Sequence, residues 1–100
     1  MFTFKKIIWE GRYRNFERER HDIKIKGKVV GSISEAHHTS ITTGFGVSFA
    51  VSRQPTKEDP APFRWWSMKT RFDNAAEAKA FLRQRFDNIV GALDLFSFEA

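Results

Sequence analysis

Residues 44–52, GFGVSFAVS, alternate without interruption between large apolar and small side chains. Phe45, Val47, Phe49 and Val51 hold the odd positions, and glycine, serine or alanine fills every even one. Because successive side chains of a strand point to opposite faces, the segment predicts a strand with one apolar face and one face of small residues. The small face is flat enough to lie under a helix or against the backbone of a partner.

Three more strands are predicted before this one. Residues 2–9, FTFKKIIW, are rich in β-branched and aromatic side chains, which favour a strand. Ile23 and Ile25 alternate with lysines, and residues 26–28, KGK, are typical of a tight hairpin turn. The strand returns over residues 29–35, where Gly31 indicates a bulge or a close backbone approach.

A fifth strand and a helix are predicted after residue 52. Residues 53–62 contain three prolines and predict a connection, followed by a strand over residues 63–72. On that strand the core face is predicted to carry Trp66, Met68 and Phe72. Asn74 caps the helix, with Glu77 three residues later as in a capping box. One apolar stripe follows at helical spacing: Ala78, Leu82, Phe86, Ile89 and Leu93, widened by Phe81 and Val90.

The order of these elements predicts an α+β fold in a single domain, residues 1–100. It is an antiparallel β-meander of about five strands with one C-terminal helix packed on one face. Residues 93–98 either finish the helix or pair with the sheet as a short last strand. With no cysteine, the chain has no disulfide, cysteine-based zinc site or thiol nucleophile. No apolar run has the length of a signal peptide or membrane span, so we expect a cytoplasmic protein with no membrane partner.

The positive charge of the chain is concentrated at its N-terminal end. The net charge is +5. Residues 1–28 contain nine lysines and arginines against four acids, whereas residues 29–100 contain eight of each. Such clustering favours an anionic partner: a nucleic acid, an acidic protein or a membrane surface. The alternative is a basic surface that serves only solubility.

Within that region, residues 12–28 read RYRNFERERHDIKIKGK, and every basic residue has an even number. If the segment is extended, one side becomes a row of cations able to follow a phosphate backbone: Arg12, Arg14, Arg18, Arg20, Lys24, Lys26 and Lys28. The alternative is a charged loop paired internally with Glu17, Glu19 and Asp22. The pattern leaves open whether residues 12–21 form a strand or a loop.

A second candidate surface lies on the predicted fifth strand, on the face away from the core. It carries Trp65, Lys69 and Arg71, an aromatic ring with two cations, which suits stacking of a base and binding of its phosphate. Alternatively, Trp65 is half-buried by residues 53–62 or by the partner in a homodimer.

No pattern indicates catalysis, a metal or a cofactor. His37 and His38 are adjacent, so on a strand they point to opposite faces and do not converge on one metal. There is no nucleophile elbow and no glycine-rich loop that opens the helix. We therefore expect a non-enzymatic protein without cofactor, metal or catalytic residues.

Residues 64–86, RWWSMKTRFDNAAEAKAFLRQRF, resemble the last strand and helix of the ethylene-response-factor type DNA-binding domain, which tyrosine integrases also use at their arm sites. Phe72, Asn74, Glu77 and Ala78 fit the pattern F-x-T-x-E-E-A at the start of the family's helix. Met68 stands where the family has tryptophan. The resemblance implies a sheet that lies in the major groove, braced by the helix.

Together these features predict a small basic binding module for nucleic acid, with DNA as the first expectation. The alternative function is that of an inhibitor or accessory protein of the phage or mobile-element type, which binds a larger acidic protein or self-associates as a homodimer.

Overall fold

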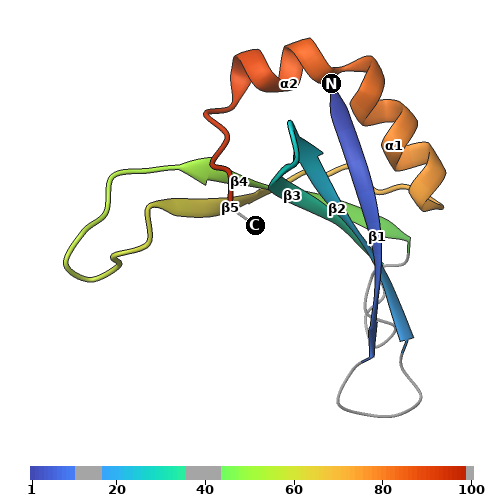
Figure 1. Cartoon of the computed structure of the whole chain (residues 1–100), viewed down its shortest axis with the longest axis horizontal. Coiled ribbons are helices and arrows are strands. Elements are labelled where there is room, and N and C mark those ends of the chain that lie inside the picture. Colours follow the sequence, from blue (N-terminus) through green and yellow to red (C-terminus); the bar gives the residue numbers. More distant parts are fainter. Residues whose placement is uncertain (11–16, 36–43, 99–100) are drawn as a thin grey trace.

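The computed structural model describes residues 1–10, 17–35 and 44–98, with backbone only at residues 8–10 and 17–18. Within these residues, five strands form one antiparallel sheet in sequential order: β1 (Phe2–Glu10), β2 (Glu17–Ile25), β3 (Lys28–Glu35), β4 (Phe45–Ser52) and β5 (Phe63–Ser67). Two short helices, α1 (Ala75–Gln84) and α2 (Phe86–Ala92), lie over one face of that sheet (Figure 1). The predicted α+β meander is confirmed, with the helical segment divided in two.

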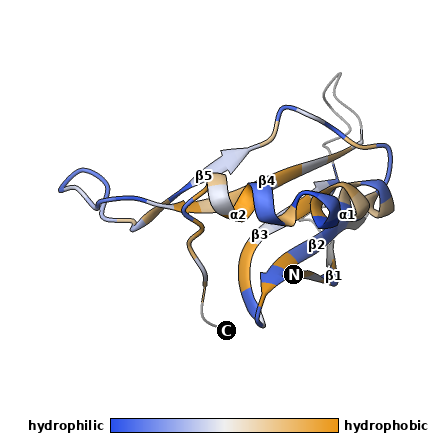
Figure 2. Cartoon of the chain, turned by 90° about the horizontal axis from the view of Figure 1, so that it is seen from above, coloured by the Kyte–Doolittle hydropathy of each residue, from blue (hydrophilic) through white to orange (hydrophobic). Residues whose placement is uncertain are grey.

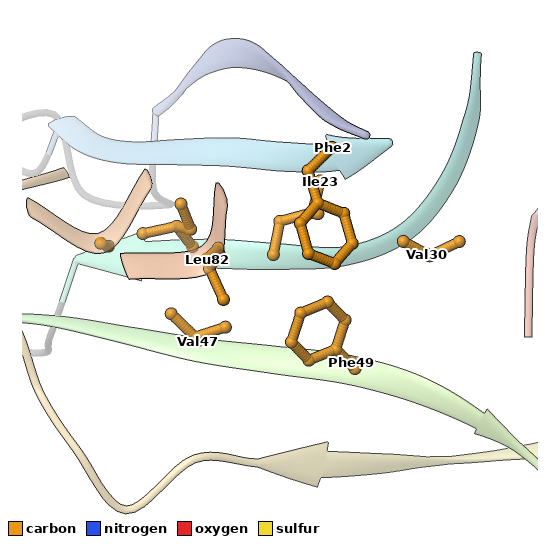
Figure 3. Packing of buried hydrophobic residues seen from close by; sticks show 8 residues of the cluster. Phe2, Ile23, Val30, Val47, Phe49 and Leu82 are labelled. Atoms are coloured by element: carbon orange, nitrogen blue, oxygen red, sulfur yellow. The ribbon is translucent and has the colours of Figure 1, made fainter. Parts of the chain in front are cut away.

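The core lies between the helices and the apolar face of the strands (Figure 3). Phe2 of β1, Ile23 of β2 and Phe49 of β4 are almost fully buried, and Leu82 packs onto them from α1. Burying each such side chain contributes about 1.5–3 kcal/mol relative to an exposed one. The Phe2 ring contacts Phe49 with centroids 5.8 Å apart and meets Phe86 edge-on at 4.8 Å. The core therefore joins both helices to the first and fourth strands.

Strand β4 has the two faces that its alternation predicts. Val47 and Phe49 are buried in the core, whereas Ser48 points to the opposite side and pairs with Ser32 and Ser67. The helices cover the apolar face of β4, so the face of small residues does not lie under a helix. We call that opposite side of the sheet the outer face.

The β2–β3 hairpin forms as the sequence predicts. Lys26 and Gly27 both have positive φ, 52° and 80°, as a two-residue turn of this hairpin type requires. The pairing shifts register between Ile23 and Lys24, which leaves Val30 as the extra residue of a bulge. Beside it, Gly31 approaches β4 so closely that a Cβ would lie 2.3 Å from the carbonyl oxygen of Ser48. Gly31 thus has both of its predicted roles.

The helical segment begins at its predicted cap and bends once. The Asn74 Oδ1 accepts a hydrogen bond of 2.9 Å from the backbone N–H of Glu77. Helix α1 ends at Gln84 and is capped by Arg85, whose N–H donates to the carbonyls of Phe81 and Leu82. After this bend, Phe86, Ile89 and Leu93 still pack on the core, but Val90 is 42% exposed. The predicted apolar stripe is therefore continuous except at Val90.

The segment after α2 pairs with the sheet, which decides between the two predicted alternatives. The N–H of Phe96 donates to the Ala50 carbonyl at 2.8 Å, and the N–H of Phe98 donates to the Val29 carbonyl at the same distance. The segment is therefore wedged between the end of β4 and the start of β3, where the bulge separates them. Leu95 packs on the core, whereas Phe96 and Phe98 contact Phe63 of β5.

Strand β5 is an edge strand that corrects one core prediction. Met68 and Phe72 pack on the core, but Trp66 is 36% exposed and is absent from the core cluster. The reason is the position of the helices: α1 packs against β1 and β4 and does not extend over the β5 edge. Beyond β5, the hydrophilic connection of residues 53–62 projects away from the helices (Figure 2).

Two glycine substitutions test this packing with opposite expected signs. Gly31→Ala forces β3 away from Ser48 and should lower the free energy of unfolding by about 1–3 kcal/mol. Gly91→Ala in α2 meets no atom within 4 Å and should raise it by about 0.5–1 kcal/mol, because alanine favours the helix. Urea denaturation measures both. A Gly31→Ala variant as stable as the original chain would contradict the close approach of β3 and β4.

Candidate nucleic-acid interface

The outer face carries two rows of side chains that the strand register aligns. Successive pairings place one residue of each strand in the first row: Lys5, Asp22, Ser32, Ser48 and Ser67. The neighbouring row contains Arg20, Ser34 and Gly46. The middle of this face is therefore a floor of short side chains, with cations toward β1 and β2. No described helix covers it (Figure 1).

The serine floor is the part of the site that sequence reasoning did not select. Ser48 and Ser67 are joined by a hydrogen bond of 2.9 Å between their hydroxyl oxygens. Hydroxyl groups both donate and accept, so such a floor can bind phosphates, sugars or base edges. The available signal was the alternation of serine with apolar residues in β3 and again in β4. Only the register across two strand pairings, β3–β4 and β4–β5, shows that these serines are neighbours.

Arg71 lies across this floor, above Gly46. A Cβ built on Gly46 would be 3.3 Å from the Nη1 atom of Arg71, so the glycine leaves the space that the guanidinium occupies. Arg71 lines a hollow of about 280 Å³ together with Ser34, Ser48, Ser67 and the acidic Glu35. The Glu35 Oε2 accepts a hydrogen bond of 3.1 Å from the Glu19 backbone N–H. The hollow thus has a guanidinium and hydroxyls, the groups that bind phosphate oxygens.

The basic row predicted for residues 12–28 is only partly formed. Arg20 and Lys24 share the outer face of β2, with Asp22 between them. The Asp22 Oδ1 is 3.5 Å from the Arg20 Nε, and the Arg20 side chain is still 45% exposed. The backbone of Arg18 pairs with Trp9, but its side chain lies outside the described part, as do Arg12 and Arg14. The histidine pair at residues 37–38 also lies outside the described residues.

Lys26 and Lys28 depart from this row, because the hairpin turns between them. Lys26 is a turn residue, and Lys28 pairs with Ile25 on the side of the sheet that faces the helices. Both lysines line a second hollow, of about 410 Å³, between the hairpin and α2. They are therefore separated from the outer face, and the even-numbered pattern does not make a single row through residue 28.

Trp65 lies on the outer face, at the β5 end of the floor, and is 53% exposed. Its ring stacks on Phe98 with centroids 5.9 Å apart and meets Phe63 edge-on at 5.7 Å. The ring is thus supported by the C-terminal segment rather than by residues 53–62. Lys69 is exposed between β5 and α1. Trp65, Arg71 and the serine floor lie on the same side of the sheet as Arg20 and Lys24, so part of each of the two predicted surfaces lies on the outer face.

Lys6, on the other face of β1, is already paired with a carboxylate. Its Nζ is 2.9 Å from the Glu19 Oε1. The hydrogen bond from Lys6 lowers the pKa of Glu19 below its ordinary value, against the opposing effect of partial burial. The charge of Lys6 is therefore largely compensated within the chain.

Comparison with known proteins gave no significant match: no family model, curated protein or solved structure aligns with the chain. The resemblance of residues 64–86 to the ethylene-response-factor type domain stays a prediction. No helix in the described ranges is long and apolar enough to cross a membrane.

The Lys6–Glu19 pair generates a pH-dependent prediction. Because the pKa of Glu19 is lower in the folded chain, the pair stabilises the fold above the unfolded pKa, about 4.3. That contribution is lost as pH falls through the lower folded value. Lys6→Met should therefore cost up to about 1 kcal/mol near neutral pH and much less at about pH 2, because acid protonates carboxylates and weakens the pair.

Urea titrations at the two pH values measure the difference. Lys69→Met is the matched control, since no ion pair is found for Lys69 in the described part of the chain. An equal loss for Lys6→Met at both pH values would show that Lys6 acts through packing and not through Glu19.

Proposed function

We propose that the protein is a non-enzymatic nucleic-acid-binding module and that the outer face of its sheet is the binding surface. The observation that carries the proposal is the joint placement of Arg20 and Arg71 over a floor of serine hydroxyls beside the exposed Trp65. Guanidinium groups bind phosphates by paired hydrogen bonds, and aromatic rings stack on bases. DNA is the first ligand to test.

Two further features support this proposal. The excess positive charge of the chain lies within residues 1–28, and three of those cations, Lys5, Arg20 and Lys24, lie on the outer face, where they attract a polyanion. The family resembled by residues 64–86 binds DNA through a sheet that a helix braces. Here the helices likewise pack on one face and leave the other for a ligand (Figure 1).

The test removes two cations from the outer face. Arg20→Ser with Arg71→Ser should weaken binding of a mixed-sequence oligonucleotide, offered as duplex and as single strand. For each phosphate that is no longer neutralised, the slope of log K against log salt should fall by about 0.7 on a single strand and about 0.9 on a duplex. The matched control is Lys57→Ser with Arg64→Ser, which removes the same charge away from the outer face. If both double variants lose the same affinity, binding depends only on the net charge of the chain and not on the outer face, and the proposal is overturned.

A second candidate function is docking to a protein or to a second copy of the chain. The observation that favours it is β5, an edge strand on which Trp65 and Trp66 are exposed on opposite faces. Edge strands pair readily with other strands. If the protein has this function, we expect either a mass in solution above the 11.7 kDa of one chain or an acidic protein that co-purifies with it. A monomer that captures no protein would contradict it, and sedimentation equilibrium measures the mass.

A further inference from the structure

Resting on the proposed function, the shape of the outer face defines which form of nucleic acid it accepts. The candidate binding side chains are spread over the sheet: Arg20 lies on β2, Arg71 above β4 and Trp65 on β5. Adjacent strands are about 4.8 Å apart, so three intervals separate β2 from β5 by about 14 Å. A ligand that touches all three side chains must lie across several strands.

Duplex DNA fits this arrangement poorly. Its major groove is about 12 Å wide and accepts a helix or a two-stranded ribbon. The five-stranded sheet measures about 19 Å across its strands, so its open face cannot enter that groove with Arg20 and Trp65 both touching the DNA. Because the bases of a duplex are stacked on one another, a duplex lying against this broad, twisted face (Figure 1) would leave the Trp65 ring without a base to stack on.

Trp65 has the properties of a fixed stacking platform. Phe98 stacks on it and Phe63 meets it edge-on, while 53% of the residue stays accessible. Phe63 is in turn held by Phe96, with centroids 5.0 Å apart. Because the ring is held before a ligand arrives, little side-chain entropy is lost when a base stacks on it. An exposed aromatic ring on a sheet is the feature by which single strands are bound, since only unpaired bases offer their faces.

The phosphates and sugars of such a strand have their own partners. Arg71 lies over Gly46, four residues along β4 from Ala50, the residue that pairs with Trp65. At about 3.3 Å per residue, the separation along the strand is about 13 Å. Between these two points the floor carries only Ser48 and Ser67, whose hydroxyls are within reach of a sugar–phosphate backbone. No large side chain of this floor blocks the path.

We propose that the ligand of the outer face is a single-stranded nucleic acid, with an unpaired base stacked on Trp65 and its backbone held by Arg71 and Arg20 over the serine floor. The chemistry used, a base face and phosphates, is common to DNA and RNA.

Fluorescence anisotropy tests the inference with three labelled probes: oligo-deoxythymidine, oligo-uridine and a duplex, each of about 15 nucleotides or base pairs, within the site sizes of sheet-based single-strand binders. At least one single strand should bind at least about tenfold more tightly than the duplex. Trp65→Ala should weaken that binding about fivefold to hundredfold, and Trp65→Phe should restore most of it, because a stacking ring remains. The duplex affinity should change little in either variant.

Trp66→Ala is the matched control, since Trp66 is an exposed neighbour that points to the opposite face. It should leave single-strand binding unchanged. Circular dichroism and the urea midpoint show whether each variant is folded. If Trp65→Ala does not fold, Trp65→Phe still tests the inference. Comparing the two single strands shows which of the two, the DNA or the RNA oligomer, the outer face binds more tightly.

The outcomes separate this inference from the proposed function. A duplex bound as tightly as both single strands, or equal reductions of affinity in Trp65→Ala and Trp66→Ala, overturns the single-strand inference and leaves nucleic-acid binding standing. Failure of all three probes to bind at low salt overturns both.

Discussion

The insertion of residues 94–98 between β3 and β4 is the constraint on which the described structure most depends. Three backbone hydrogen bonds hold the segment: the N–H of Phe96 donates to Ala50, the N–H of Phe98 donates to Val29, and the carbonyl of Asp94 accepts from Ser52. Backbone groups at the separated strand ends are thereby paired instead of remaining exposed or unsatisfied. Side chains alternate along the segment. Leu95 therefore packs on the main core, whereas the rings of Phe96 and Phe98 lie on the outer face. One short segment thus stabilises both sides of the sheet.

This insertion links the C-terminal end of the described chain to the proposed binding surface. Phe98 supports the Trp65 ring, and Phe96 supports Phe63, which holds Trp65 from a second direction. Ala50 is fully buried beneath this aromatic group although it belongs to the face of small residues. The outer face therefore has a small core of its own at the β5 end and an open polar floor beside it. A supported ring next to hydroxyls and guanidinium groups is the arrangement on which the proposed binding by this face rests.

Much of this fold was predictable from local pattern, because strand alternation and helix capping are encoded over a few residues. The β4 alternation, the Lys26–Gly27 turn, the role of Gly31 and the Asn74 cap were all predicted. The position of the helices across the sheet was not predictable, since it depends on packing between distant residues. That is why the sequence places Trp66 in the core and leaves two alternatives for residues 93–98. The serine floor was missed for the same reason: its residues come from three strands.

The candidate site shows where charge pattern is a reliable guide and where it fails. Alternation keeps Arg20 and Lys24 on one face, but the turn at Lys26 ends the alternation and sends Lys28 to the opposite side. The pattern therefore predicted that Arg20 and Lys24 share one face of β2, and it overestimated the length of the basic row. Conversely, the position of Arg71 over the floor depends on Gly46, which carries no charge but leaves room for the guanidinium. A charge pattern does not reveal such a residue.

Mapping a bound oligonucleotide by NMR would test the central claim, that the outer face is the binding surface, most directly. On titration with a single-stranded oligomer, the account predicts that amide shifts change at Ser32, Ser48 and Ser67, together with the indole N–H of Trp65. The amide chemical shifts of α1 and α2 should not change, because the helices lie on the opposite face (Figure 1). Shifts confined to the helices, or to the hollow beside Lys26, would contradict the account.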